Sequence, residues 1–221
     1  MYAQWKARLH PSMRLHLVEL AGRGRRFQDC LYGTMSEVVE DIYGRIEPQL
    51  EAGDFAFFGH SMGALICYEL IGKIWSRRNL APIHAFLSGR VPPNNHETKM
   101  LHLQSDADLM AEVTRWGGFS AQQLADNTFI RMLLPILRAD LKVVETYHLP
   151  ERKYHRLPCP LSILTGANDA IAEAWKMQRW ADFTTQSCSF HVFPGDHFYI
   201  IECKEKVVHL INSVVFPATP L

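Results

Sequence analysis

The chain has 221 residues, of which 48% are hydrophobic and 21% charged, and its formal net charge is zero. This length and composition are typical of one folded domain with a sizeable core, and they argue against disorder and low-complexity structure. The balanced charge gives no overall attraction to nucleic acid or to an anionic membrane. The sequence contains no run of about 18 apolar residues, so neither a membrane span nor a signal peptide is expected.

The cysteines are scattered, at Cys30, Cys67, Cys159, Cys188 and Cys203. Their odd number and the lack of a CxxC pair disfavour both a disulfide framework and a zinc site. We therefore expect a reducing, cytoplasmic setting and no bound metal.

Short apolar runs alternate with longer helical patterns along the chain. Residues Met35–Leu50 and Met62–Arg78 each have an apolar stripe at helical spacing. Strands are predicted for the short runs, which are followed by turn residues, over 15–20, 55–58, 83–87, 161–164 and 189–193. The alternation predicts an α/β fold, with a mostly parallel sheet and helices on both of its faces.

One long stretch, about residues 96–150, departs from this alternation. It has helical patterns over Ser105–Trp116 and Asn127–Tyr147, separated by the loop Gly117–Ser120, and no convincing strand. We expect a single domain over residues 1–221 that carries this stretch as a helical insertion. A lid over the site is favoured because long excursions of this kind are usually functional, and a helical decoration without a gating role is the alternative.

The strongest local motif is Gly59-His-Ser-Met-Gly63, a G-x-S-x-G pattern between a predicted strand and a predicted helix. In this context the motif is typical of a nucleophile elbow, a tight turn that exposes a serine and needs small residues two positions away on each side. Ser61 is the candidate nucleophile. The backbone amide of Met62, at the start of the helix, is the candidate oxyanion donor.

A serine hydroxyl needs a base, and the base needs a carboxylate that holds it in the right tautomer. In α/β-hydrolases these groups follow in the chain order Ser, acid, His. Asp169 comes directly after the predicted strand 161–164 and its Gly turn, which makes it the candidate acid. Asn168 is neutral and would stabilise an imidazolium poorly, and Asp182 lies within a helical pattern.

The candidate base is His197, in the loop after the last predicted strand, because loops at the carboxyl edge of an open α/β sheet carry binding sites. His155, His191 and His209 are the other histidines in this part of the chain. His191 falls in the middle of a strand and His209 on a C-terminal helix. His60 is interpreted as a packing residue beside the site.

Further motifs lie outside the elbow, at Gly22–Arg26, Leu134–Asp140, Glu145–Tyr147, Gly166–Asp169 and Gly195–Phe198. Together with Gly59–Ala64 they resemble the type II thioesterases that accompany nonribosomal peptide and polyketide synthases, and their relatives in medium-chain fatty acid release. The first motif has Ala21 where that family usually has proline. The resemblance covers nearly the whole chain.

The resemblance implies hydrolysis of acyl or peptidyl thioesters from the phosphopantetheine arm of carrier proteins, with the insertion acting as a lid. It assigns the triad to Ser61, Asp169 and His197. The implied partner is a carrier protein, with no nucleic acid, no membrane and no cofactor, and a monomer is expected. The same triad could serve a carboxylesterase or lipase-like hydrolase, or the fold could be a non-catalytic module that binds carrier protein.

Charged residues in two of these motifs have simpler interpretations. Arg23, Arg25 and Arg26 could contact a carrier protein or the phosphate of its arm, but a solvated loop is favoured. Arg138 and Asp140 match the family pattern, yet an ion pair on a helix surface explains them equally well.

The start of the chain departs from the family. Members resembled here begin with an additional apolar strand and a Gly-rich loop, and only then enter the helix that residues 2–9 are expected to continue. By that topology the strand lies between the predicted strands 15–20 and 55–58, and its loop supplies a second oxyanion amide. We therefore expect Met1 to correspond to an internal methionine, and this chain to be weakly stable or poorly active without about 20 to 30 upstream residues.

Overall fold

The computed structural model describes residues 2–51, 53–95, 99–148 and 154–217. Its sheet is fully parallel, with the strands in chain order, β1 (Ala56–His60), β2 (His84–Ser88), β3 (Leu161–Gly166) and β4 (Cys188–Phe193). Because the strands are parallel, their carboxyl ends meet at one edge of the sheet. The loops that follow the strands are thereby brought together.

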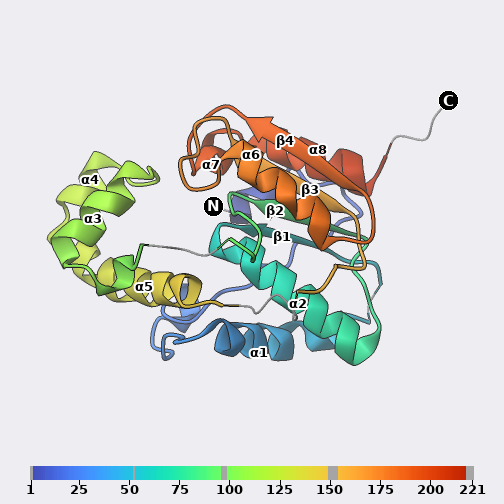
Figure 1. Ribbon diagram of the computed structural model, residues 1–221, viewed down its shortest axis with the longest axis horizontal. Coiled ribbons are helices and arrows are strands. Elements are labelled where there is room, and N and C mark those ends of the chain that lie inside the picture. The colour runs from blue at the N-terminus through green and yellow to red at the C-terminus, as the bar shows by residue number, and fades with distance from the viewer. Residues whose placement is uncertain (1, 52, 96–98, 149–153, 218–221) are drawn as a thin grey trace.

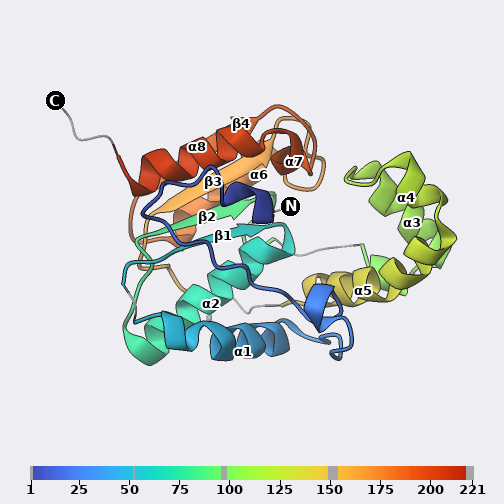
Figure 2. The same cartoon turned by 180° about the vertical axis from the view of Figure 1, so that it is seen from behind.

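Helices cover both faces of the sheet, as predicted (Figures 1 and 2). On one face lie α2 (Met62–Arg78), α6 (Ala174–Met177) and the 3-10 helix η6 (Gln178–Phe183). On the other lie α8 (Lys204–Val215), α7 (Tyr199–Glu202) and the 3-10 helix η1 (Tyr2–Trp5). Helix α1 (Met35–Ile46) packs against α2, and the 3-10 turn η3 (Glu47–Gln49) follows it.

Strand β3 shows why an all-parallel sheet needs a layer of helices on each face. Leu161 and Ile163 of β3 pack in the core under α2 and η6, whereas Leu164 packs in the core under α8. All residues of β3 are buried, as expected for a strand whose alternate side chains meet helices on either side.

Four of the five predicted strands are confirmed, within one or two residues at their ends. The prediction for 15–20 is wrong, because no hydrogen-bond ladder joins this segment to a strand in the described part of the chain. An apolar run becomes a strand only where its backbone groups find such partners. The helix expected over 2–9 is limited to η1, which packs through Trp5 and Tyr2 against Phe58 of β1.

The stretch predicted as a helical insertion contains the 3-10 turn η4 (Leu101–Leu103) and the helices α3 (Asp106–Arg115), α4 (Ala121–Ala125) and α5 (Asn127–Glu145). No strand occurs between residues 99 and 148. Helix α4 was not predicted, although the sequence contains the capping box by which Ser120 and Gln123 begin it. The predicted ends of the insertion, at 96–98 and 149–150, lie outside the described residues. The helices stand beyond the carboxyl ends of the strands, beside the sheet (Figure 1).

Most charged residues of the motifs form ion pairs with distant segments. Arg138 and Asp140 are not paired with each other, because residues two apart on a helix do not face one another. Arg138 instead binds Asp106, and Asp140 accepts two hydrogen bonds, of 2.7 and 2.9 Å, from Arg23. Arg26 is also bound, with its guanidinium 2.7 Å from a carboxylate oxygen of Asp41.

The favoured interpretation of a solvated arginine loop is therefore wrong for Arg23 and Arg26. It holds for Arg25, whose side chain is 93% exposed. Two of the three arginines are used in fixing the loop to neighbouring helices, so they are not free to bind an external phosphate.

Trp180 of η6 tests the packing on the α2 side of the sheet. It is fully buried, and its Nε1 donates a 2.7 Å hydrogen bond to the carbonyl oxygen of Arg90. Trp180→Phe removes that donor and leaves unfilled volume, so we expect the free energy of unfolding to fall by about 1–3 kcal/mol. Trp75→Phe, at a half-exposed position on α2, is the matched control. Equal midpoints in urea denaturation for the two variants would contradict this account.

Candidate active site

Ser61 occupies a strained turn between β1 and α2. Its backbone angles are φ 55° and ψ −121°, a conformation that residues other than glycine rarely adopt. The amide of Ser61 donates a 2.8 Å hydrogen bond to the carbonyl oxygen of Ser88, at the end of β2. The neighbouring strand therefore holds the turn in place, as the elbow motif predicts.

The two glycines of the motif have different reasons to be glycine. A Cβ on Gly59 would overlap the carbonyl group of Gly63, so the turn closes only without a side chain at position 59. A Cβ on Gly63 would meet no atom within 4 Å. The predicted need for a small residue is thus confirmed at position 59 and wrong at position 63, because Gly63 makes the close approach through its backbone.

The structure brings the three predicted residues into one hydrogen-bond chain. His197 Nε2 lies 3.0 Å from Ser61 Oγ, and His197 Nδ1 lies 2.9 Å from Asp169 Oδ2. Ser61 Oγ and Asp169 Oδ2 therefore lie on opposite sides of one imidazole ring. In this arrangement the ring can take a proton from the serine while the carboxylate stabilises the charge that results.

Asp169 is delivered by the turn after β3. Its second carboxylate oxygen accepts hydrogen bonds from the amides of Ile171 (2.9 Å) and Ala172 (3.0 Å). Burial by itself raises the pKa of this carboxyl, but the hydrogen bond and charge of His197, together with the two amides, lower it below its usual value. Asp169 is thus held as a carboxylate.

The residues weighed against His197 and Asp169 lie elsewhere. His191 is within β4 and contacts Ser189, and His155 stacks on the ring of Tyr68. His209 belongs to α8, and Asp182 is exposed on η6. Asn168 shares the turn with Asp169, and its backbone N–H donates a hydrogen bond to the carbonyl oxygen of Gly195.

Two residues that the sequence analysis did not single out also lie at the site. Ser88 Oγ is 2.8 Å from Nδ1 of His60 and 2.6 Å from the hydroxyl of Tyr199. The position of Ser88, at the carboxyl end of a strand, is a signal that could have identified it. Tyr199 carries no such signal, since only the fold brings α7 beside β2.

Met62 is the first residue of α2, so its amide lies at the positive end of a 17-residue helix. This is the position that an oxyanion donor requires, and the role itself stays a prediction.

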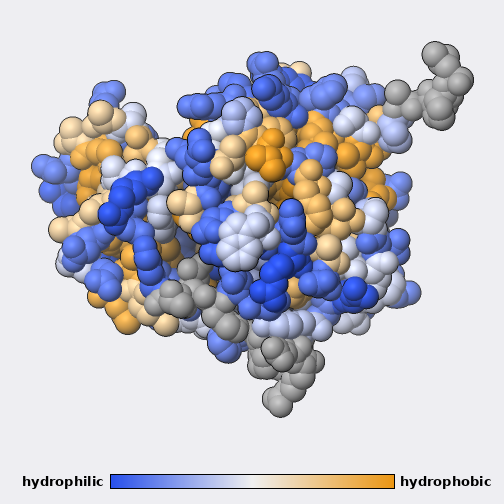
Figure 3. Space-filling view, turned by 45° about the horizontal axis from the view of Figure 1, so that its top comes forward, coloured by the Kyte–Doolittle hydropathy of each residue, from blue (hydrophilic) through white to orange (hydrophobic). Residues whose placement is uncertain are grey.

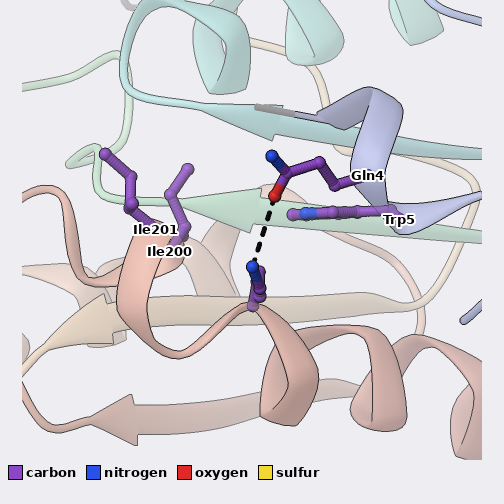
Figure 4. A pocket seen from close by; sticks show the side chains of 5 residues that line it. Gln4, Trp5, Ile200 and Ile201 are labelled. Atoms are coloured by element: carbon purple, nitrogen blue, oxygen red, sulfur yellow. Dashed lines mark hydrogen bonds between the residues drawn. The ribbon is translucent and has the colours of Figure 1, made fainter.

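Neither of two hollows found elsewhere on the chain contains these residues. One, of about 140 Å³, is lined by Gln4 and Trp5 of η1 and by Ile200, Ile201 and Lys204 (Figure 4). The other, of about 680 Å³, lies within the insertion, between residues 99–104 and α3. The site is therefore identified by its hydrogen bonds rather than by the size of a cavity. Among the described residues, no cluster of three or more His, Cys, Asp or Glu could hold a metal ion, and no helix has the length and apolar character of a membrane span.

Comparison with known proteins agrees with the motifs. The family described as "Thioesterase domain" matches residues 1–215. Thioesterase PikA5 of Streptomyces venezuelae is 32% identical, over 100% of this chain and 82% of that protein. The structure of ClbQ from the colibactin NRPS/PKS pathway matches with a TM-score of 0.91 at 30% identity, over 97% of this chain and 90% of that one. YbtT, a type II thioesterase from the Yersiniabactin NRPS/PKS pathway, matches with a TM-score of 0.83 at 27% identity, over 95% and 85%.

The family match spans nearly the whole chain, and the solved relatives share its sheet and surrounding helices. The chain therefore belongs to the thioesterase family, with the α/β-hydrolase type of fold.

Proposed function

We propose that this protein hydrolyses acyl or peptidyl thioesters carried on the phosphopantetheine arm of a carrier protein, using Ser61, His197 and Asp169. The observation that carries the proposal is the continuous hydrogen-bond chain from Ser61 Oγ through both nitrogens of His197 to Asp169. The strained elbow at Ser61 and the membership of the thioesterase family support it further.

The reaction proceeds in two halves. His197 Nε2 takes the hydroxyl proton as Ser61 Oγ attacks the thioester carbonyl, and the protonated imidazole then gives this proton to the leaving thiolate. His197 then takes a proton from water, and the water oxygen attacks the resulting acyl-serine ester. As the ester bond breaks, the acid is released and the imidazolium gives its proton to Ser61 Oγ, which restores the hydroxyl. Asp169 keeps the imidazole in the tautomer that accepts at Nε2. The amide of Met62 stabilises the oxyanion in both halves.

The choice of a carrier-bound substrate rests on the relatives. ClbQ and YbtT are each described as coming from an NRPS/PKS pathway. A carrier protein in such a system presents its acyl group as a thioester, and we propose the same partner here.

We further propose that the chain forms one domain, in which α3, α4 and α5 act as a lid. The turn at Gly117 and Gly118 supports this, because it packs on the loop that carries His197. A Cβ on Gly117 would lie 2.6 Å from a carboxylate oxygen of Asp196, and one on Gly118 would lie 2.7 Å from the ring of Phe198. Figure 3 shows the surface notched between this insertion and the rest of the molecule. The turn between α3 and α4 therefore contacts the loop that carries His197.

The nucleophile is tested by Ser61→Ala. We expect turnover of an acyl carrier protein substrate to fall by several orders of magnitude, because members of a triad act as a unit. Ser76→Ala, an exposed serine on α2, is the control and should keep wild-type turnover. A fluorophosphonate probe should label wild type and not Ser61→Ala. Retained turnover in Ser61→Ala would contradict the assignment, and a strong preference for matched oxygen esters would favour a carboxylesterase.

The pH dependence of turnover tests whether His60 becomes protonated in the working range. Burial and the neighbouring His197 lower the pKa of His60 to about 3, and the pKa of Asp169 is also below its usual value. Neither of these two groups should therefore take up a proton as the pH falls from about 8 to 5. We expect log(kcat/KM) to fall on the acid side with a slope no steeper than about one, because His60 and Asp169 add no second protonation. A slope near two would contradict the lowered pKa of His60 or of Asp169.

The lid contact is tested by Gly118→Ala. Gly118 has φ 87°, which an alanine adopts only with strain, and the new methyl group would press on Phe198. If the lid must close on this loop, kcat/KM for a carrier-bound substrate should fall about fivefold or more. Gly44→Ala, at an open position on α1, is the control. Unchanged kcat/KM in a folded Gly118→Ala protein would argue for a helical decoration.

A further inference from the structure

His60 directly precedes Ser61 in the chain, and its ring is held by a hydrogen bond to β2. Its Nδ1 lies 2.8 Å from Ser88 Oγ, while the carbonyl oxygen of the same Ser88 accepts the amide of Ser61. Ser88 therefore fixes both the turn of the nucleophile and the ring beside it.

The hydroxyl of Ser88 continues the chain to Tyr199. The two hydroxyl oxygens are 2.6 Å apart, and both residues are buried. Tyr199 follows His197 by two residues, and its ring stacks on Phe193 with centroids 5.3 Å apart. Three elements that meet only in the folded chain, the ends of β1 and β2 and the start of α7, are thus joined by hydrogen bonds behind the site.

The ring of His60 in turn packs beside that of His197. Their centroids are 4.9 Å apart, with an angle of 40° between the planes. A Cβ on Gly89 would lie 2.6 Å from Cε1 of His60 and 3.2 Å from Cε1 of His197. Both imidazoles therefore converge over Gly89, which leaves no space for a side chain between them and β2.

This contact supplies a constraint that the hydrogen bonds of His197 leave open. The bonds at Nδ1 and Nε2 hold two atoms of the ring, and the Cβ–Cγ bond holds a third point. Hydrogen bonds tolerate a spread of angles, so small changes in the two side-chain torsions can still tilt the ring while both bonds persist, unless something packs against the ring itself. His60 provides such packing, and Phe198 lies edge-on to the same ring, with centroids 5.2 Å apart.

His60 is suited to packing rather than to proton transfer. Its Nε2 is buried and has no hydrogen-bond partner among the described residues, so no path for a proton leads through it. Burial and the charge of His197 lower its pKa to about 3, against the opposite effect of Asp169. The ring therefore stays neutral when His197 becomes an imidazolium, and it adds no repulsion between like charges.

We propose that His60, held by Ser88 and Tyr199, is a positioning residue that sets the tilt of the His197 ring toward Ser61. The inference rests on the function proposed above. It assigns the histidine of the G-x-S-x-G motif a role in the chemical step that does not involve contact with the substrate.

The test is His60→Asn. The asparagine amide can replace Nδ1 in the bond to Ser88, but the ring that packs beside His197 is lost. We expect kcat to fall about 10- to 100-fold with KM changed less than about twofold, since a small misplacement of a catalytic group has effects of this size. Active sites counted with a fluorophosphonate should match the protein concentration. A merely structural role would instead lower that count and the melting temperature, with kcat per labelled site unchanged.

The matched control is His84→Asn. His84 Nε2 makes a 2.9 Å hydrogen bond to Ser162 Oγ, the same kind of bond to a serine of the neighbouring strand, but at the amino end of β2. Its kcat per labelled site should equal that of wild type. Tyr199→Phe removes one hydroxyl and no packing volume, so it should lower kcat in the same way as His60→Asn, though less, and it keeps the test available if His60→Asn does not fold.

Each outcome separates the two proposals. If wild type hydrolyses the thioester, and His60→Asn and Tyr199→Phe both match its kcat per labelled site, the positioning role is overturned and the proposed function stands. A rise in KM at constant kcat would also overturn it, because His60 would then contact the substrate. If wild type is neither labelled at Ser61 nor active on acyl carrier protein, the proposed function fails first.

Discussion

The site depends on one close approach within the backbone, between Gly59 and the carbonyl group of Gly63. This approach lets the chain turn from β1 into α2 within a single residue, and it places Ser61 in a conformation that the residue would not adopt alone. The strain is held by the bond from the Ser61 amide to Ser88 and by the long buried helix that follows. Ser61 is half-buried, and these contacts hold its turn in place at the edge of the sheet.

The parallel sheet explains how the other residues reach that serine. Asp169 follows β3, and His197 follows β4, so both are delivered at the same edge as Ser61. Residues more than a hundred positions apart in the chain thereby come within 3.0 Å of one another. The insertion leaves the sheet from the same edge, which is why a turn within it can contact the loop that carries His197.

Most of the fold, and the meeting of Ser61, Asp169 and His197, could be predicted from the sequence, because each depends on local patterns. β1 and α2 are apolar runs on either side of a recognisable turn, and Asp169 and His197 each follow such a run. The segment 15–20 could not be judged this way, since an apolar run becomes a strand only if the fold offers it a partner. The pairing of Arg23 with Asp140 and of Arg138 with Asp106 likewise depends on contacts between distant segments.

The same reason explains why the hydrogen bonds among His60, Ser88 and Tyr199 were missed. His60 and Ser88 each stand at the carboxyl end of a strand, but their bonds to each other and to Tyr199 exist only where β1, β2 and α7 meet. Sequence patterns identify a chemical group that must be present. They do not identify the neighbours that hold it at a given angle.

The bonds at the base of the insertion have a consequence for how such proteins diversify. Glu145, near the end of α5, accepts hydrogen bonds from the amides of Leu101 and His102 and from the ring of His102. Arg138 binds the carbonyl oxygens of His102 and Gln104. The first and last parts of the insertion are thus fastened to each other. The end of α5 is also anchored to the rest of the chain, because Asp140 binds Arg23 and because Val143 and Val144 are buried with residues of α1 and α2. The far part of the insertion, α3 and α4, can therefore change in length while the end of α5, the sheet and its serine turn stay unchanged (Figure 1).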